Sequence, residues 1–129
     1  MTVRSRFSRR LALAASFAVL AGCTPVNSPP RSVIFFTNQS VALDGPARGS
    51  IAEVVADANA HPNVRIHIRG FADPTVTPDV QALATKRAQV VTDELLAEGI
   101  APARISQVGR AATRSEPGVE SRRVEIEFR

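Results

Sequence analysis

Cysteine is nearly absent from this 129-residue sequence, and the single one, Cys23, has no partner for a disulfide bond within the chain. Tryptophan and tyrosine are missing, so no indole or phenol ring is available to stack on nucleic acid bases. Only two histidines occur. His61 directly precedes a proline and His67 falls in the middle of an expected strand, so their spacing predicts neither a metal site nor a bound cofactor.

The excess of positive charge is confined to the beginning of the chain. The sequence has 16 basic and 12 acidic residues, which gives a formal net charge of +4. All 12 acidic residues follow Cys23, but four of the basic ones precede it. The chain beyond Cys23 is therefore close to neutral, and a nucleic acid partner, which needs a retained basic surface, is not expected.

The first 22 residues have the layout of a secretory signal peptide. Four arginines (Arg4, Arg6, Arg9, Arg10) precede an apolar stretch over 11–21, which is shorter than the roughly 20 residues that span a bilayer. The pair Arg9-Arg10 also hints at twin-arginine export, although an ordinary basic start is the simpler interpretation. We expect residues 1–22 to be a signal peptide that is removed.

Cys23 ends the run Leu20-Ala21-Gly22-Cys23, which resembles the lipobox of bacterial lipoproteins. This resemblance implies cleavage before Cys23 and attachment of lipid, including palmitate, to the new first residue. Thr24 follows the cysteine where an aspartate would have suggested retention at the inner membrane, so the resemblance implies the outer membrane. The alternative is an ordinary signal peptide with a chance cysteine at its end.

Residues 23–32 predict a short tether between the lipid and the folded part. Three prolines, an asparagine and two serines lie within it, a composition typical of an extended linker. Nine such residues reach at most roughly 30 Å. The folded domain, expected over 33–129, would therefore lie close to the membrane.

Hydrophobic periodicity predicts the first half of that domain. An apolar run over 33–36 predicts a buried strand. Asp44 and Pro46 are typical of a helix start, and an apolar stripe follows before Pro62 ends the helix. Residues 64–69 alternate between apolar and polar, which predicts a half-buried strand.

The second half follows the same logic. Thr77, Pro78 and Asp79 predict the start of a helix that ends at Gly99. We expect its inner face to carry Leu83, Ala88, Val90, Val91 and Leu95. Strands are predicted over 105–108 and 123–129. The predicted fold is α+β, with the order β-α-β-α-β-β and both helices on one face of a four-stranded mixed sheet.

One group of charged residues suggests binding chemistry. Gly70 frees the backbone where the second strand turns into a loop, Asp73 follows in that loop, and Arg87 lies on the second helix. A carboxylate and a planar guanidinium would together suit a zwitterion, because one takes an ammonium and the other a carboxylate. The alternative is an Asp73–Arg87 ion pair that only joins loop to helix.

Three segments together resemble the OmpA-like peptidoglycan-binding domain, the family of the peptidoglycan-associated lipoproteins. The segments are Gly70-Phe71-Ala72-Asp73, Leu83-Ala84-Thr85-Lys86-Arg87-Ala88 and Arg122-Arg123-Val124-Glu125-Ile126. The resemblance implies a noncatalytic lipoprotein that ties the outer membrane to peptidoglycan through diaminopimelate in the stem peptides. It implies that Asp73 binds the ammonium and Arg87 the carboxylate, with Asn38 and Arg122 nearby.

A second hypothesis is a degenerate domain that keeps this fold but binds a protein partner in the cell envelope. It is motivated by Phe71, Ala72 and Val80, which stand where the family usually has polar residues. An enzyme is not expected, because Ser106 and Ser115 have no general base at a recognisable spacing.

Overall fold

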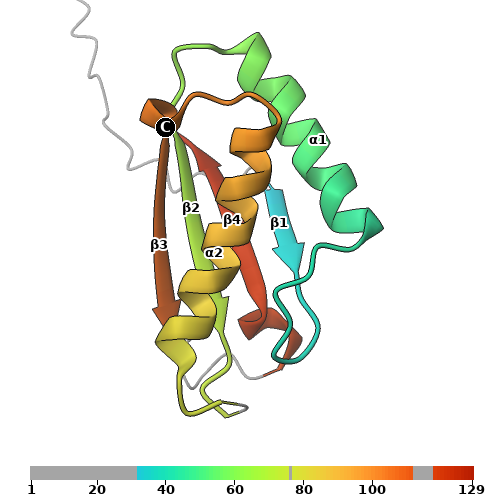
Figure 1. The fold of residues 1–129 in the computed structure, drawn as a ribbon, viewed down its shortest axis with the longest axis vertical. Coiled ribbons are helices and arrows are strands. Elements are labelled where there is room, and N and C mark those ends of the chain that lie inside the picture. Colours follow the sequence, from blue (N-terminus) through green and yellow to red (C-terminus); the bar gives the residue numbers. More distant parts are fainter. Residues whose placement is uncertain (1–31, 76, 112–117) are drawn as a thin grey trace, which may run out of the picture.

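A computed structural model of the protein describes residues 32–75, 77–111 and 118–129 (Figure 1). Four strands and two helices alternate along the chain in the predicted order. A short 3-10 turn precedes each of the last two strands. The elements are β1 (Ser32–Phe35), α1 (Gly45–Ala60), β2 (Ile66–Ala72), α2 (Val80–Ala97), η1 (Pro102–Arg104), β3 (Ile105–Ala111), η2 (Val119–Ser121) and β4 (Arg123–Phe128).

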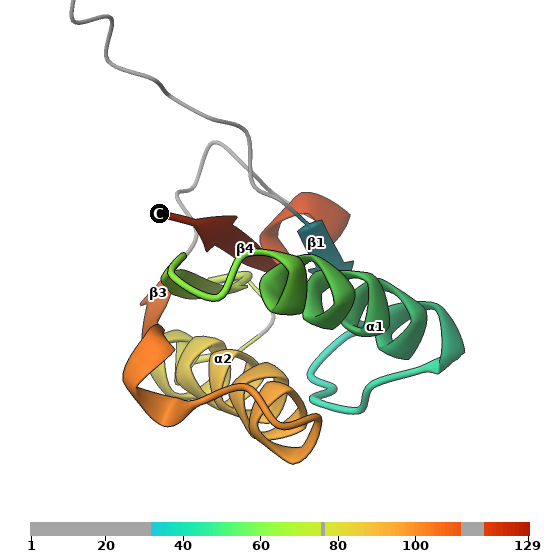
Figure 2. The same ribbon diagram turned by 90° about the horizontal axis from the view of Figure 1, so that it is seen from above.

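The strands form one sheet in the order β1-β4-β2-β3. β4 runs antiparallel to both of its neighbours, whereas β2 and β3 are parallel. Both helices cover the same face of this sheet, which Figure 2 shows from above. The predicted α+β fold, with two helices on one face of a mixed sheet, is confirmed.

Side-chain alternation places the core between the sheet and the helices. Ile66 and Ile68 of β2 and Val124 and Ile126 of β4 are fully buried, as their period of two predicts. The stripe of α1 packs against them from above: Ala47, Ile51, Val54, Val55 and Ala58. The buried positions recur every second residue in the strands and every three or four residues in α1, which is the spacing of a single buried face.

The capping of α1 agrees with the prediction, whereas the start of α2 differs. Asp44 accepts a hydrogen bond from the Ala47 amide at 2.8 Å, so it caps α1. The cap of α2 is Asp79, which accepts from the Ala82 amide at 3.3 Å, and the helix begins at Val80 rather than at Thr77. The Thr77 hydroxyl instead accepts from the Asp79 amide, because it closes the turn that leads into the helix.

The buried face of α2 is partly the one expected, because Ala88, Val91 and Leu95 are buried as predicted. Ala84, Arg87 and Thr92 are buried too, whereas Leu83 and Val90 are only half-buried. The prediction weighted large apolar residues and therefore missed the small residues Ala84 and Thr92. That face meets the sheet at Gly70, which the sequence had suggested as a hinge into the loop but which lies inside β2.

Gly70 and Gly109 are register partners on β2 and β3, and both lie under α2. A Cβ atom on Gly70 would lie 2.1 Å from the carbonyl oxygen of Ala84 and 2.9 Å from the amide nitrogen of Ala88. On Gly109 it would lie 2.4 Å from the hydroxyl of Thr85. The two glycines therefore let the helix backbone approach the sheet directly.

The other face of the sheet is polar, as the sequence predicts. Arg69 pairs with Glu125 at 2.9 Å and also with Glu127, and His67 Nδ1 lies 2.8 Å from the Ser106 hydroxyl. Burial, together with the positive charge of Arg129, lowers the pKa of His67. In the part of the chain that the structure describes, neither helix is both long and apolar enough to cross a membrane.

We predict that Gly70→Ala destabilises the protein by about 1–3 kcal/mol, because the new methyl group must push α2 away from the sheet. The measurement is urea unfolding followed by circular dichroism. The control is Gly49→Ala, which lies in α1 with nothing within 4 Å of the added atom. It should stabilise the protein by about 0.5–1 kcal/mol. Equal effects of the two substitutions would contradict the close approach.

Candidate functional site

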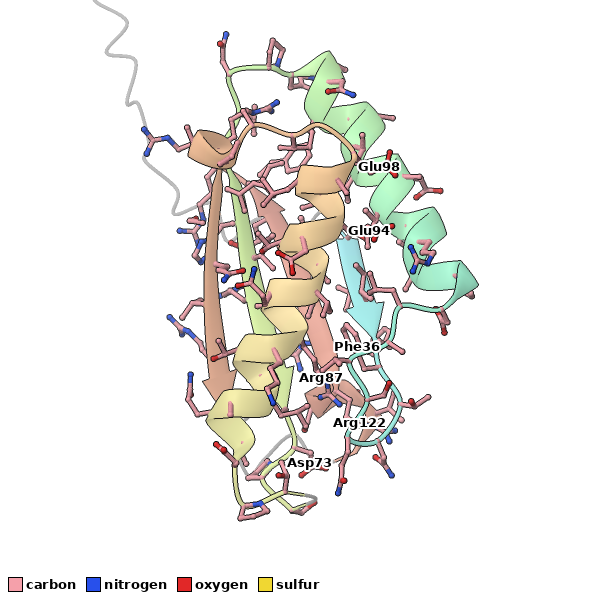
Figure 3. All side chains as sticks on the ribbon, in the orientation of Figure 1. Phe36, Asp73, Arg87, Glu94, Glu98 and Arg122 are labelled. Atoms are coloured by element: carbon pink, nitrogen blue, oxygen red, sulfur yellow. The ribbon has the colours of Figure 1, made fainter. Side chains whose placement is uncertain are left out.

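The predicted site residues come together at one end of the sheet, where β1 and β2 finish. Asn38 lies in the turn after β1, Asp73 in the loop after β2, Arg87 on α2, and Arg122 just before β4. Figure 3 shows Asp73, Arg87 and Arg122 gathered at this end of the molecule. Because four separate segments supply them, only the folded chain can assemble the group.

Asp73 is almost fully buried, with 3% of its surface exposed. One carboxylate oxygen accepts from the Thr75 amide at 2.7 Å and from the Thr75 hydroxyl at 2.6 Å. The other accepts from the Gly118 amide at 3.2 Å, which ties the loop to the segment before η2. The bonds from Thr75 lower the pKa of Asp73, with a smaller contribution from Arg122. Asp73 is therefore held as a carboxylate.

Arg87 is wholly buried, and its guanidinium donates to three backbone carbonyls. Nε donates to Ser40 at 3.0 Å, Nη1 to Phe71 at 3.0 Å and Nη2 to Thr37 at 3.2 Å. Burial, then the positive charge of Arg122, lowers the pKa of Arg87, but an arginine remains charged in proteins. Since a guanidinium has five N–H groups, each terminal nitrogen keeps one beyond these bonds.

The alternative interpretation, an Asp73–Arg87 ion pair that joins loop to helix, is wrong. No ion pair within 4.0 Å connects these two described residues, and the ring of Phe36 lies 5.3 Å from the Arg87 guanidinium carbon. Neutral groups anchor each charge instead: backbone carbonyls hold Arg87, and two amides and a hydroxyl hold Asp73. The Phe71 carbonyl, near the end of β2, joins that strand to α2.

The positive charge of Arg122 acts on both other site residues, because it lowers the pKa of Asp73 and of Arg87. Its Nη1 donates to the side-chain oxygen of Asn38. Its Nε is buried without a hydrogen-bond partner. Leaving a buried donor unpaired costs about 1–3 kcal/mol, so this nitrogen is a feature that a bound acceptor would satisfy.

The substitutions that set this chain apart from the resembled family have different positions relative to the site. The Phe71 side chain lies on the polar face of the sheet, where the guanidinium carbon of Arg123 is 4.3 Å from its ring centre. Only the Phe71 carbonyl belongs to the site. Ala72 is buried under the helices, and Val80 is half-buried at the first turn of α2. Ser121, next to Arg122, is fully buried with an unpartnered hydroxyl.

Several residues of the site were not predicted. Thr75 follows Asp73 by two positions, which is the spacing of an aspartate turn, and this signal could have identified it. Thr37, Ser40 and Gly118 contribute only backbone groups, and a backbone contact leaves no residue signature in a sequence. Among the described residues, no group of histidine, cysteine, aspartate and glutamate side chains could hold a metal ion.

A shallow hollow of about 220 Å³ borders the turn that Arg87 holds. Gln39, in the left-handed region at φ 54°, forms one wall, and the first two turns of α2 form the other with Leu83 and Lys86. Asp79, Thr77 and Ala82 complete the lining. The hollow gives an extended ligand room beside the charged residues.

Comparison with known proteins places these residues in a family context. The model of the OmpA family matches residues 35–124. The peptidoglycan-binding protein ArfA of Mycobacterium tuberculosis is 33% identical over 110 residues, which cover 78% of this chain and 33% of ArfA. The same figures hold for ArfA of Mycobacterium bovis. The chain thus spans about a third of the length of the curated relatives it matches.

Two solved structures are similar in fold. The C-terminal domain of Helicobacter pylori MotB superposes with a TM-score of 0.67 and 26% identity, covering 76% of this chain and 84% of that one. The peptidoglycan-associated lipoprotein of Burkholderia pseudomallei has a TM-score of 0.65 at 21% identity, and the match covers 75% and 89% of the two chains.

The lowered pKa of Asp73 predicts that stability depends on pH. The ionised carboxylate of Asp73 contributes to the free energy of unfolding at every pH above the pKa that this group has in the unfolded chain. This contribution is lost as the pH falls through the lower pKa that the group has in the folded protein. We therefore expect Asp73→Asn to lower the free energy of unfolding at neutral pH, and the difference from wild type to shrink across that window. Urea unfolding at a series of pH values measures it.

A suitable control is Glu53→Gln, since Glu53 is exposed on α1. This substitution should change stability by less than about 0.5 kcal/mol at neutral pH. A wild-type advantage over Asp73→Asn that grew on acidification would contradict the sign of the pKa shift.

Proposed function

We propose that this chain, which belongs to the OmpA family, binds peptidoglycan without altering it chemically. The observation that carries the proposal is the set of three charges at one end of the sheet, each anchored by neutral groups. A charge held in this way is not neutralised by an opposite charge, so a ligand that reaches it can supply one. The relative ArfA, named as a peptidoglycan-binding protein, supports the same ligand.

The proposed ligand group is the free amino acid end of diaminopimelate in a stem peptide. Its ammonium would bind the Asp73 carboxylate, and its carboxylate would bind the two remaining N–H groups of Arg87. Arg87 is covered by the turn that includes Thr37, Asn38 and Gln39, and all three of these residues are exposed. Binding would therefore require that exposed turn to move aside.

The proposal extends to the position of the domain in the cell. Lipid on Cys23 would hold the chain at the outer membrane, with the domain facing the periplasm. The segment between Cys23 and the first strand is short, so the wall would be bound close to the membrane. This would make the protein a tether between the two layers.

Cosedimentation with purified cell-wall sacculi tests the binding. We expect wild type to cosediment and Asp73→Asn and Arg87→Lys to lose at least about tenfold in affinity, since hydrogen bonds to charged groups are worth about 1.5–3 kcal/mol. Circular dichroism verifies that each variant is folded. Glu53→Gln and Arg65→Gln, which change exposed charges elsewhere, should bind as wild type does.

Free diaminopimelate provides a test that needs no variant. It should release the wild-type protein from sacculi in a concentration-dependent way. A folded wild-type protein that stays in the supernatant would overturn the proposal. It would favour the alternative, a domain that binds a protein partner in the envelope.

The lipid anchor has its own test. Wild type expressed in a Gram-negative host should incorporate labelled palmitate and fractionate with the outer membrane. Cys23→Ser should incorporate none and lose the membrane association, because one thiol carries the proposed attachment. Palmitate incorporation by Cys23→Ser would refute the assignment, and Ser121→Ala, a variant without a change near the lipobox, serves as the control.

A further inference from the structure

We propose that Arg122 binds a second carboxylate of the ligand, so that the site prefers a diaminopimelate whose two carboxylates are both free. This inference rests on the proposed function. It goes beyond it by naming which form of the stem peptide the site selects and which residue makes the selection.

The three charged residues of the predicted site carry two positive charges and one negative charge. Among the described residues, Arg87 donates to carbonyls, Arg122 to the amide oxygen of Asn38, and Asp73 accepts from two amides and a hydroxyl. Within the described parts of the chain, none of the three belongs to an ion pair within 4.0 Å. A zwitterionic head group would neutralise Asp73 and one arginine, and it would leave the second arginine without a counter-charge.

Among the described residues, one edge of the Arg122 guanidinium has no hydrogen-bond partner. Nη1 faces Asn38, whereas Nε is buried without a partner and Nη2 has none among the described residues. Nε and Nη2 together form the side of the fork to which a carboxylate binds through two parallel hydrogen bonds. A carboxylate placed there would satisfy the buried Nε and supply the missing negative charge.

Among the described residues, Arg122 is the cation that lowers the pKa of both Asp73 and Arg87, and its sequence neighbour Arg123 is not placed to bind the second carboxylate. Arg123 points to the opposite face of the sheet, where it stacks on Phe71 and pairs with Glu125 at 2.7 Å. The second carboxylate of diaminopimelate is at the peptide-linked end of that residue, and in this proposal it binds Arg122.

Two synthetic stem peptides with acetylated amino termini test the proposal. Both end in diaminopimelate with a free ammonium and carboxylate at its side-chain end. The carboxyl group at the peptide-linked end is free in one peptide and a carboxamide in the other. Isothermal titration of the full chain at low salt should show wild type binding the free acid about ten- to a hundredfold more tightly.

The variants separate the role of Arg122 from a structural one. Arg122→Gln should bind both peptides equally, with the affinity that wild type has for the amide. Arg122→Lys should restore only part of the preference, because an ammonium keeps the charge but not the fork. Arg65→Gln removes the same charge at the other end of β2 and should keep the full preference.

Each result bears on a different claim. Equal binding of both peptides to wild type overturns the second-carboxylate site and leaves the proposed function standing. Failure of wild type to bind either peptide overturns both. Weaker binding of Arg122→Gln to both peptides, with the preference retained, makes Arg122 a structural residue and also overturns the inference.

Discussion

The buried guanidinium of Arg87 is the interaction on which this end of the molecule depends. It comes from the middle of α2 and donates to carbonyls on two other segments, the turn after β1 and the last part of β2. A wholly buried cation is costly unless its N–H groups are bonded, and here each nitrogen has an acceptor. The fold and the candidate site therefore share one anchor, which ties the turn after β1 and the end of β2 to α2.

The neighbouring charges follow the same rule of being held by neutral groups. Asp73 is bonded by amides and a hydroxyl, and Arg122 by an amide oxygen. On the polar face of the sheet the opposite arrangement holds, because Arg69, Arg123 and Arg129 all pair with glutamates. Charges on that face neutralise one another, whereas Asp73, Arg87 and Arg122 have no counter-charge among the described residues. This contrast supports the proposal of a binding site at the end of the sheet more than the number of charges does.

The sequence was sufficient for the architecture because that information is local. Alternation along 64–69 fixed which side of β2 is buried, and Asp44 marked the start of α1. The site was predictable only in its residue types. Nothing in the sequence indicated that Arg87 would be buried among carbonyls, or that Gly70 serves a close approach of the helix rather than a turn, since both follow from how α2 packs on the sheet. The small residues of α2 carried that information, but a search for large apolar side chains passes over them.

The same reasoning explains why the unusual residue after Gly70 need not disturb the site. Phe71 replaces a polar family residue, yet the site uses its carbonyl and the other face of the sheet receives its ring. The side chain of a strand residue can vary when only the backbone of that residue contacts the site and the side chain lies on the other face of the sheet. Position 122 has no such freedom, because its guanidinium itself faces Asn38 and acts on both remaining charges. The selectivity of the site should therefore depend on Arg122 rather than on the residues by which this chain departs from its family.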